Sequence, residues 1–254
     1  MKIMAPMIAI SALLLSAPAC AIVGGGVPST EGVGRSIVTI VGSRGNFCTG
    51  TFIAPSLVLT AAHCVQPGAI YKIVEYGADK QPQLQDVKNV SLHPAFNMQA
   101  MTAHRATADV ALLQLEAPPK GKVAAVLGAP QIPIVAGSRF TIAGIGVTIR
   151  GEGSSGGTIR VAGLVATGQP GTLQIRLVDP VGQGTRGGLG ACTGDSGGPV
   201  FEDRQQGGPA IVGVISWSTG PNGSAGCGGL TGVTPLTLYR DWIVQTARQW
   251  GFVL

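Results

Sequence analysis

Short apolar runs, separated by turn-forming residues, occupy most of the chain. The runs are rich in Val, Ile and Thr and end at Gly, Pro, Asn or Ser, a pattern that is typical of β-strands. It predicts strands over residues 37–41, 57–60, 70–76, 109–115, 140–147, 159–166, 173–178, 210–217 and 230–234. Many short strands with such punctuation indicate an all-β fold, built as antiparallel barrels or as a sandwich.

Apolar residues recur at helical spacing in one segment near the C-terminal end. Leu236, Tyr239, Ile243 and Ala247 would lie on one side of a helix over about residues 236–250. We expect this terminal helix to pack that side against the body of the protein.

A stretch over residues 117–137 contains Pro and Gly and is the best candidate for a linker between two halves. Residues 151–157 and 182–190 are rich in glycine and predict surface loops. A chain of 254 residues can bury a substantial core as one large domain or as two small ones.

Residues 1–21 have the features of an export signal. Lys2 gives a positive start, residues 7–15 are apolar, and Ala19-Cys20-Ala21 offers a small-x-small cleavage site. The apolar stretch is too short for a membrane span, and no later segment reaches the length of one. We therefore expect a secreted protein, extracellular or periplasmic, with a mature chain of residues 22–254. Lipid attachment at Cys20 is the alternative, because a small residue precedes that cysteine.

The composition excludes a disordered chain and gives no sign of nucleic-acid binding. Hydrophobic residues make up 45% of the chain, and its 40 Gly and 17 Pro suit many turns. The formal net charge is +5, and it falls by one if Lys2 leaves with the signal. Because the basic residues form no cluster, this surplus favours an ordinary solvated surface over a nucleic-acid partner.

Four cysteines follow the signal segment: Cys48, Cys64, Cys192 and Cys227. Four cysteines allow three disulfide pairings, and an even number in an exported chain favours disulfides. Free buried thiols or a metal site are the alternatives. Since the chain has no Cys-x-x-Cys pair, we expect no metal and no other cofactor.

Two motifs carry the residues of a nucleophilic enzyme. The first, Gly194-Asp195-Ser196-Gly197-Gly198-Pro199, holds a serine between glycines, and the second, Leu59-Thr60-Ala61-Ala62-His63-Cys64, holds a histidine. A serine hydroxyl becomes a good nucleophile when a histidine takes its proton, and a carboxylate can hold that histidine in one tautomer. Asp109, which opens an apolar run, is the obvious carboxylate. The other histidines, His93 and His104, are interpreted as surface or loop residues.

The order His63, Asp109, Ser196, with these flanking residues, resembles the chymotrypsin/trypsin-like serine peptidases. The resemblance implies two six-stranded antiparallel β-barrels with a C-terminal helix, and an active site in the cleft between the barrels. The first barrel would cover about residues 22–125 and the second about residues 126–235.

The same resemblance implies a serine endopeptidase that hydrolyses protein or peptide substrates through an acyl-enzyme. The backbone N–H groups of Gly194 and Ser196 would hold the developing oxyanion, and Ser216 would hydrogen-bond Asp109. We expect a monomer whose partners are substrates and protein inhibitors. The disulfides implied are Cys48–Cys64 and Cys192–Cys227.

The resemblance also implies which residues form the pocket for the substrate side chain before the cut bond. Gly190 would lie at its base, and its walls would be Ser216, Trp217, Ser218 and Gly232. Since no carboxylate stands at the base to pair with Lys or Arg, we expect cleavage after uncharged residues.

The segment Ile22-Val23-Gly24-Gly25 resembles the new N-terminus of activated members of this family. Its α-amino group would pair with Asp195 and order the pocket. Because Ala21 closes the candidate signal-cleavage site, export alone would release this activating terminus. The alternative is that cleavage falls elsewhere and that Ile22 is only the first strand residue.

Two other functions are compatible with parts of the sequence. A peptidase fold without activity could act as a binding module, although such proteins usually lack one member of the triad. A carboxyl-ester hydrolase would need Gly-x-Ser-x-Gly before a helix, but residues 199–201 predict a strand and the histidine precedes the serine.

Between residues 117 and 180 only Gly144-Ile145-Gly146 is similar to the family, which more often has a tryptophan between these glycines.

Overall fold

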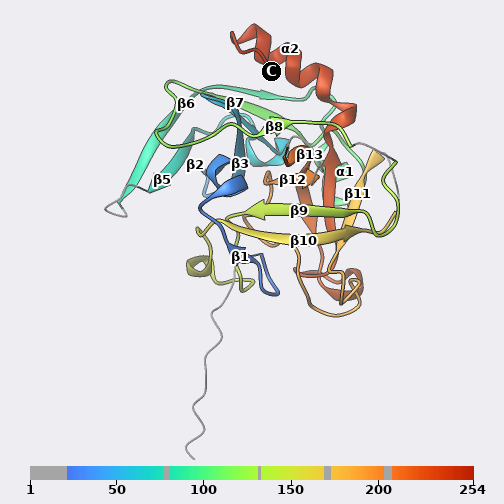
Figure 1. The fold of residues 1–254 in the computed structure, drawn as a ribbon. Coiled ribbons are helices and arrows are strands. Elements are labelled where there is room, and N and C mark those ends of the chain that lie inside the picture. Colours follow the sequence, from blue (N-terminus) through green and yellow to red (C-terminus); the bar gives the residue numbers. More distant parts are fainter. Residues whose placement is uncertain (1–21, 77–80, 131–132, 169–172, 203–207) are drawn as a thin grey trace, which may run out of the picture.

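Two closed six-stranded antiparallel β-barrels make up the molecule, and a helix follows at the C-terminal end (Figure 1). The computed structural model describes residues 22–254 except 77–80, 131–132, 169–172 and 203–207. The predicted fold class is confirmed. The segment predicted as an export signal, including Cys20, lies outside the described residues.

The first barrel closes in the ring order β2-β3-β4-β7-β6-β5. Its strands are β2 (Ile37–Gly42), β3 (Phe47–Ala54), β4 (Leu57–Thr60), β5 (Tyr71–Tyr76), β6 (Pro82–Leu92) and β7 (Ala111–Leu115). The second barrel closes in the ring order β9-β10-β11-β14-β13-β12. Its strands are β9 (Arg139–Gly144), β10 (Arg160–Ala166), β11 (Ile175–Val178), β12 (Pro199–Glu202), β13 (Ala210–Ser218) and β14 (Thr231–Pro235).

The pattern of apolar runs did not predict β3 and β6. In β3 almost every residue is buried, yet the strand is built largely from Gly, Thr, Ala and Cys rather than from Val and Ile. In β6 most residues are polar and exposed, because this strand has its outer face in solvent. Neither strand therefore shows the alternation of a half-buried strand.

The first barrel begins later than residue 22. Ile22 packs in the core of the second barrel, and the two-residue strand β1 (Val27–Pro28) pairs with β10. The strand β11 pairs only with the far end of β10, at Val165 and Ala166, so the edge at Arg160 and Val161 is open to β1. The boundary predicted at residue 22 is corrected to the start of β2.

The stretch predicted as a linker also contributes to the second barrel. Its two-residue strand β8 (Val126–Leu127) runs parallel to β13. Residues 131–132 of this stretch lie outside the described residues.

The C-terminal helix α2 (Arg240–Gln249) is shorter than predicted. Leu236–Leu238 forms a separate 3-10 turn, because Tyr239 has non-helical dihedral angles and interrupts the helix. Ile243 and Ala247 are buried on the side of α2 that joins the core of the first barrel. Other short helices among the described residues include α1 (Met98–Thr102) and the 3-10 turns Gly32–Ser36, Ala62–Cys64, Gly153–Ser155 and Pro221–Gly223.

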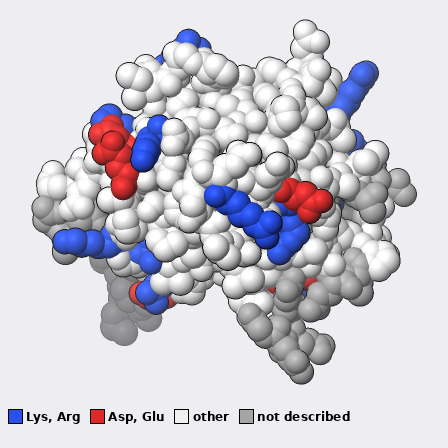
Figure 2. Space-filling view, turned by 90° about the horizontal axis from the view of Figure 1, so that it is seen from above, with Lys and Arg blue, Asp and Glu red and all other residues white. Residues whose placement is uncertain are grey.

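The two barrels pack directly against each other. Ala143, Ile145 and Phe201 of the second barrel belong to the same buried cluster as the core of the first. On the face seen from above, charged side chains are few and scattered among uncharged ones (Figure 2). No described helix is both long and apolar enough to span a membrane.

Candidate active site

His63 and Asp109 come together because their strands are neighbours in the first barrel. Thr60, at the end of β4, pairs with Ala111 at the start of β7, so the segments that flank this pair lie side by side. The 3-10 turn Ala62–Cys64 then carries the histidine toward Asp109. His63 Nδ1 lies 2.8 Å from Asp109 Oδ2, and the backbone N–H of His63 donates to Asp109 Oδ1 at 2.9 Å.

Asp109 is 0% exposed and receives a further hydrogen bond from the second barrel. The hydroxyl of Ser216, on β13, donates to Asp109 Oδ2 at 2.5 Å. The carboxylate accepts from both neighbours, so Nδ1 of His63 is the protonated nitrogen when the ring is neutral. Nε2 then carries the lone pair that can accept a proton.

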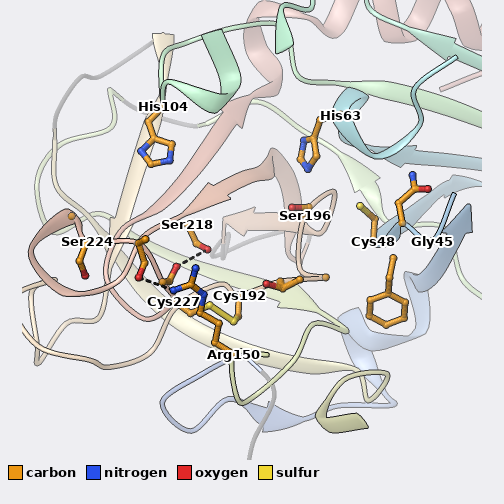
Figure 3. Close-up of a pocket in the computed structure, with 17 residues that line it drawn as sticks. Gly45, Cys48, His63, His104, Arg150, Cys192, Ser196, Ser218, Ser224 and Cys227 are labelled. Atoms are coloured by element: carbon orange, nitrogen blue, oxygen red, sulfur yellow. Dashed lines mark hydrogen bonds between the residues drawn. A yellow bond between two sulfur atoms is a disulfide. The ribbon is translucent and has the colours of Figure 1, made fainter. Parts of the chain in front are cut away.

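Ser196 faces His63 across the cleft (Figure 3). It lies on the loop between β11 and β12, and both residues line one cavity of about 790 Å³. Among the described residues, the Ser196 hydroxyl has no hydrogen bond within 3.5 Å. Such contacts are often long in a free enzyme and shorten when substrate binds.

The loop around Ser196 needs glycine at two positions. Gly194 and Gly197 have φ angles of +96° and +82°, which L side chains rarely adopt. A Cβ at Gly194 would also lie 2.8 Å from the Phe47 ring. The backbone can therefore approach the first barrel closely at both sides of the serine.

Asp195 points away from the cavity and is 0% exposed. Its two carboxylate oxygens accept hydrogen bonds of 2.8 Å from the backbone N–H groups of Gly146 and Cys192. Burial raises the pKa of Asp195 to about 7, against the lowering effect of these two hydrogen bonds and of the Arg160 charge. A Cβ at Gly144 would stand 2.1 Å from Asp195 Oδ1, so the Gly-Ile-Gly segment leaves the space that the carboxylate fills.

Ile22 is fully buried in the same core as the second barrel's strands. Val23, which follows it, forms an isolated bridge with Gly190. In this chain the nitrogen of Ile22 belongs to a peptide bond with Ala21. The ion pair between Ile22 and Asp195 therefore remains a prediction.

Both disulfides implied by the family resemblance are present. Cys48–Cys64 joins β3 to the turn that carries His63, and Cys192–Cys227 joins the Ser196 loop to the loop after β13. Ligand atoms of Cys48, His63 and Cys64 lie within 4.8 Å of one another, a separation that would suit a metal ion. Because the two sulfurs are bonded in the disulfide, neither offers a thiolate to a metal.

The family model for trypsin matches residues 23–243. The chain belongs to the trypsin family. Trypsin 5G1 of Aedes aegypti is 30% identical over 243 residues, which cover 89% of this chain and 85% of that protein. Glucanase inhibitor protein 4 of Phytophthora infestans is 27% identical, over 76% of this chain and 77% of its own. The solved structure of human heparin binding protein matches with a TM-score of 0.66 at 25% identity, over 87% of this chain and 95% of that chain.

One of the five residues predicted for the substrate pocket lines the cavity that holds Ser196 and His63 in this trypsin-family chain. Ser218 lines the cavity, whereas Gly190, Ser216, Trp217 and Gly232 are not among its lining residues. The Trp217 ring covers Gly232, where a Cβ would come within 2.0 Å of the ring.

Two of the lining residues that were not identified from the sequence, His104 and Arg150, have basic side chains. His104, interpreted as a surface or loop residue, stacks on Trp217 with ring centroids 4.4 Å apart and lines the cavity. Arg150 lies on the opposite wall and donates to the carbonyl of Ala225 at 2.9 Å (Figure 3). Both sit in loops, so no hydrophobic period marks them, and only the folded chain brings them to the cleft.

Thr49 is a third residue that the sequence did not single out. It lies on β3, is fully buried, and contacts the loop of Ser196 through both its backbone and its side chain. The only local signal is its position next to Cys48, whose disulfide partner adjoins His63.

Proposed function

We propose that this trypsin-family protein is a secreted serine endopeptidase that uses His63, Asp109 and Ser196 as its catalytic triad. The single observation that carries the proposal is the cavity shared by Ser196 and a histidine held by a buried carboxylate. A serine beside a correctly oriented imidazole is the arrangement that nucleophilic acyl transfer needs.

The reaction would begin when Nε2 of His63 takes the proton from Ser196 Oγ. The oxygen attacks the peptide carbonyl, and the N–H groups of Gly194 and Ser196 stabilise the oxyanion that forms. Asp109 stabilises the imidazolium, which then protonates the leaving amine as the peptide bond breaks. Water then attacks the acyl-enzyme while His63 takes its proton. His63 returns that proton to Ser196 Oγ as the acyl–serine bond breaks, which frees the serine.

The substrate side chain before the cut bond would be uncharged rather than Lys or Arg. The fully buried carboxylates Asp109 and Asp195 cannot pair with a cation in the cavity, and the charged side chain on its wall, Arg150, is itself basic. Binding a Lys or Arg side chain without a partner would cost several kcal/mol.

Activation would depend on a free amine at Ile22. Because Asp195 is buried with only backbone hydrogen bonds, a neighbouring ammonium group would favour its charged form. Removal of the export signal after Ala21 would create that amine without a separate propeptide cleavage. N-terminal sequencing of the active exported protein tests this, since any start other than Ile22 contradicts it.

A binding module without activity is the second candidate. Relatives of this chain include proteins named as an inhibitor and as a heparin binding protein. The presence of all three triad residues in this chain supports the enzyme instead.

A serine-directed phosphonate distinguishes the two candidates. The enzyme should be labelled at Ser196 and should cleave a random peptide library, with the cut positions identified by mass spectrometry. Ser196→Ala should fold like the wild type but neither react nor cleave. Hydrolysis by the Ser196→Ala protein would refute the triad.

A further inference from the structure

We propose that Thr49 is a positioning residue for the oxyanion-binding loop. The Thr49 hydroxyl, which belongs to the first barrel, holds the carbonyl of Gly194 in place by a hydrogen bond. The N–H groups of Gly194 and Ser196 therefore stay directed at the substrate carbonyl. The inference rests on the function proposed above and adds a residue outside the triad to it.

Three hydrogen bonds attach Thr49 to the second barrel. Its Oγ1 donates to the carbonyl oxygen of Gly194 at 2.8 Å and accepts from the N–H of Ile145 at 3.1 Å. Its backbone N–H donates to the carbonyl oxygen of Ser196 at 2.8 Å. A hydroxyl has one proton to donate, so these two side-chain partners give Oγ1 one defined orientation.

The bond to Gly194 fixes the peptide plane between Gly194 and Asp195. With φ of +96° and no side chain, Gly194 has backbone freedom that other residues lack. An oxyanion hole is effective only when its donors lie about 2.7–3.1 Å from the place where the charge develops. A hydroxyl that pins the adjacent carbonyl therefore preserves the donor geometry.

Thr49 also connects the two segments that surround Asp195. Ile145, which donates to Thr49, precedes Gly146, whose N–H donates to Asp195 Oδ1. Gly194, which accepts from Thr49, precedes Asp195 itself. One hydroxyl on the first barrel thus joins the segment after β9 to the loop that carries Ser196.

The loop that carries Ser196 packs closely against Thr49 and Thr60. A Cβ at Gly197 would stand 2.2 Å from the Thr49 carbonyl oxygen and 2.1 Å from Thr60 Oγ1. Thr60 in turn donates to that same carbonyl at 2.9 Å. The loop of Ser196 therefore lies directly on β3 and on the end of β4.

Thr49→Val tests the hydroxyl with almost no change in shape. It leaves the Gly194 carbonyl and the Ile145 N–H without their partner, whereas Thr49→Ser keeps the hydroxyl. Thr51→Val is the matched control, because Thr51 lies on the same strand, is 1% exposed, and has an Oγ1 with no hydrogen-bond partner among the described residues.

We expect Thr49→Val to lower kcat by about tenfold or more with KM nearly unchanged, a smaller loss than the 10²–10³ that follows removal of an oxyanion donor itself. The affinity for a peptide aldehyde, which forms an oxyanion on Ser196, should fall by a similar factor. The affinity for a product-like peptide should not change. Thr49→Ser should recover most of the activity, and Thr51→Val should behave as the wild type.

Three results would overturn the inference. The first is a wild-type kcat and aldehyde affinity in Thr49→Val. The second is a loss of kcat in Thr51→Val equal to that in Thr49→Val. The third is that Thr49→Val loses as much affinity for the product-like peptide as for the aldehyde. If Thr49→Val does not fold, Thr49→Ala and Thr49→Ser are compared in the same measurements, and wild-type kcat in Thr49→Ala overturns it. A wild type that neither cleaves peptides nor reacts with the phosphonate rejects the proposed function itself, whereas an active wild type with an unaffected Thr49→Val rejects only the role of Thr49.

Discussion

Asp195 is a carboxyl group whose environment favours the neutral form until a cation is supplied. It is fully buried, and burial raises its pKa to about 7 from an ordinary value of 3.8. An acid with a raised pKa in the folded state holds its proton there over a range where the unfolded chain has lost it. The free energy of unfolding therefore decreases as pH rises from about 4 to about 7.

This behaviour predicts a difference between the chain with its N-terminal residues attached and the chain that begins at Ile22. In the longer chain, the free energy of unfolding should decrease between pH 4 and pH 7. Asp195→Asn should remove the part of this decrease that is due to Asp195. In the shorter chain the fall should be smaller, because the Ile22 ammonium favours the ionised carboxylate.

Urea unfolding of both chains and of the Asp195→Asn variants, at several pH values across this window, measures the effect. The difference between wild type and variant isolates Asp195 from the other acids. If that difference does not depend on pH in the longer chain, Asp195 is not held in the neutral form.

At the scale of elements, α2 joins the core of the first barrel although it follows the last strand of the second. Ile243 is 0% exposed and belongs to the same buried cluster as Leu112 of β7 and the adjacent Val110. The helix thus connects the two barrels through apolar burial, which is the main source of stability for such a contact.

Truncation of Ile243 should be costly for this reason. Ile243→Ala removes buried carbons and leaves a cavity, and it should lower the free energy of unfolding by about 2–5 kcal/mol. Gln245→Ala, at an exposed position of the same helix, should change it by less than about 0.5 kcal/mol. Chemical denaturation of both variants measures the difference, and equal effects would contradict the packing of α2.

At the scale of the whole molecule, the cleft between the barrels has basic walls. Arg150 lies on one side and His104 on the other, and Arg176 lies 5.7 Å from the centroid of the Trp217 ring on which His104 stacks. Asp109 and Asp195 are fully buried, and neither carboxylate lines the cavity. The field in the cleft should therefore attract negative charge.

We predict that peptides with Glu on either side of the cut bond have kcat/KM several-fold higher than matched peptides with Lys at low ionic strength. The ratio should decrease in high salt, because mobile ions screen exposed charges. Arg150→Gln should also reduce it. Arg248→Gln, an equal change of charge on the exposed part of α2, should leave it unchanged. A higher kcat/KM for the Lys peptides would contradict the basic character of the cleft.

The sequence alone predicted the fold class, most strands and, through the family resemblance, both cysteine pairs. Strands such as β4 and β13 were predictable because their apolar runs are local. The motifs around His63 and Ser196 were equally local, since they are contiguous in the sequence.

Tertiary structure alone decided the features that depend on contacts between distant segments. The position of β1 on the second barrel follows from the open edge of β10, and β3 is buried because both barrels cover it rather than because its own residues are strongly apolar. His104 and Arg150 reach the cleft through loops, and Thr49 meets Gly194 across 145 residues of sequence. A hydrogen bond or a stacked ring of this kind depends on how two elements pack, and no periodicity within either element encodes it.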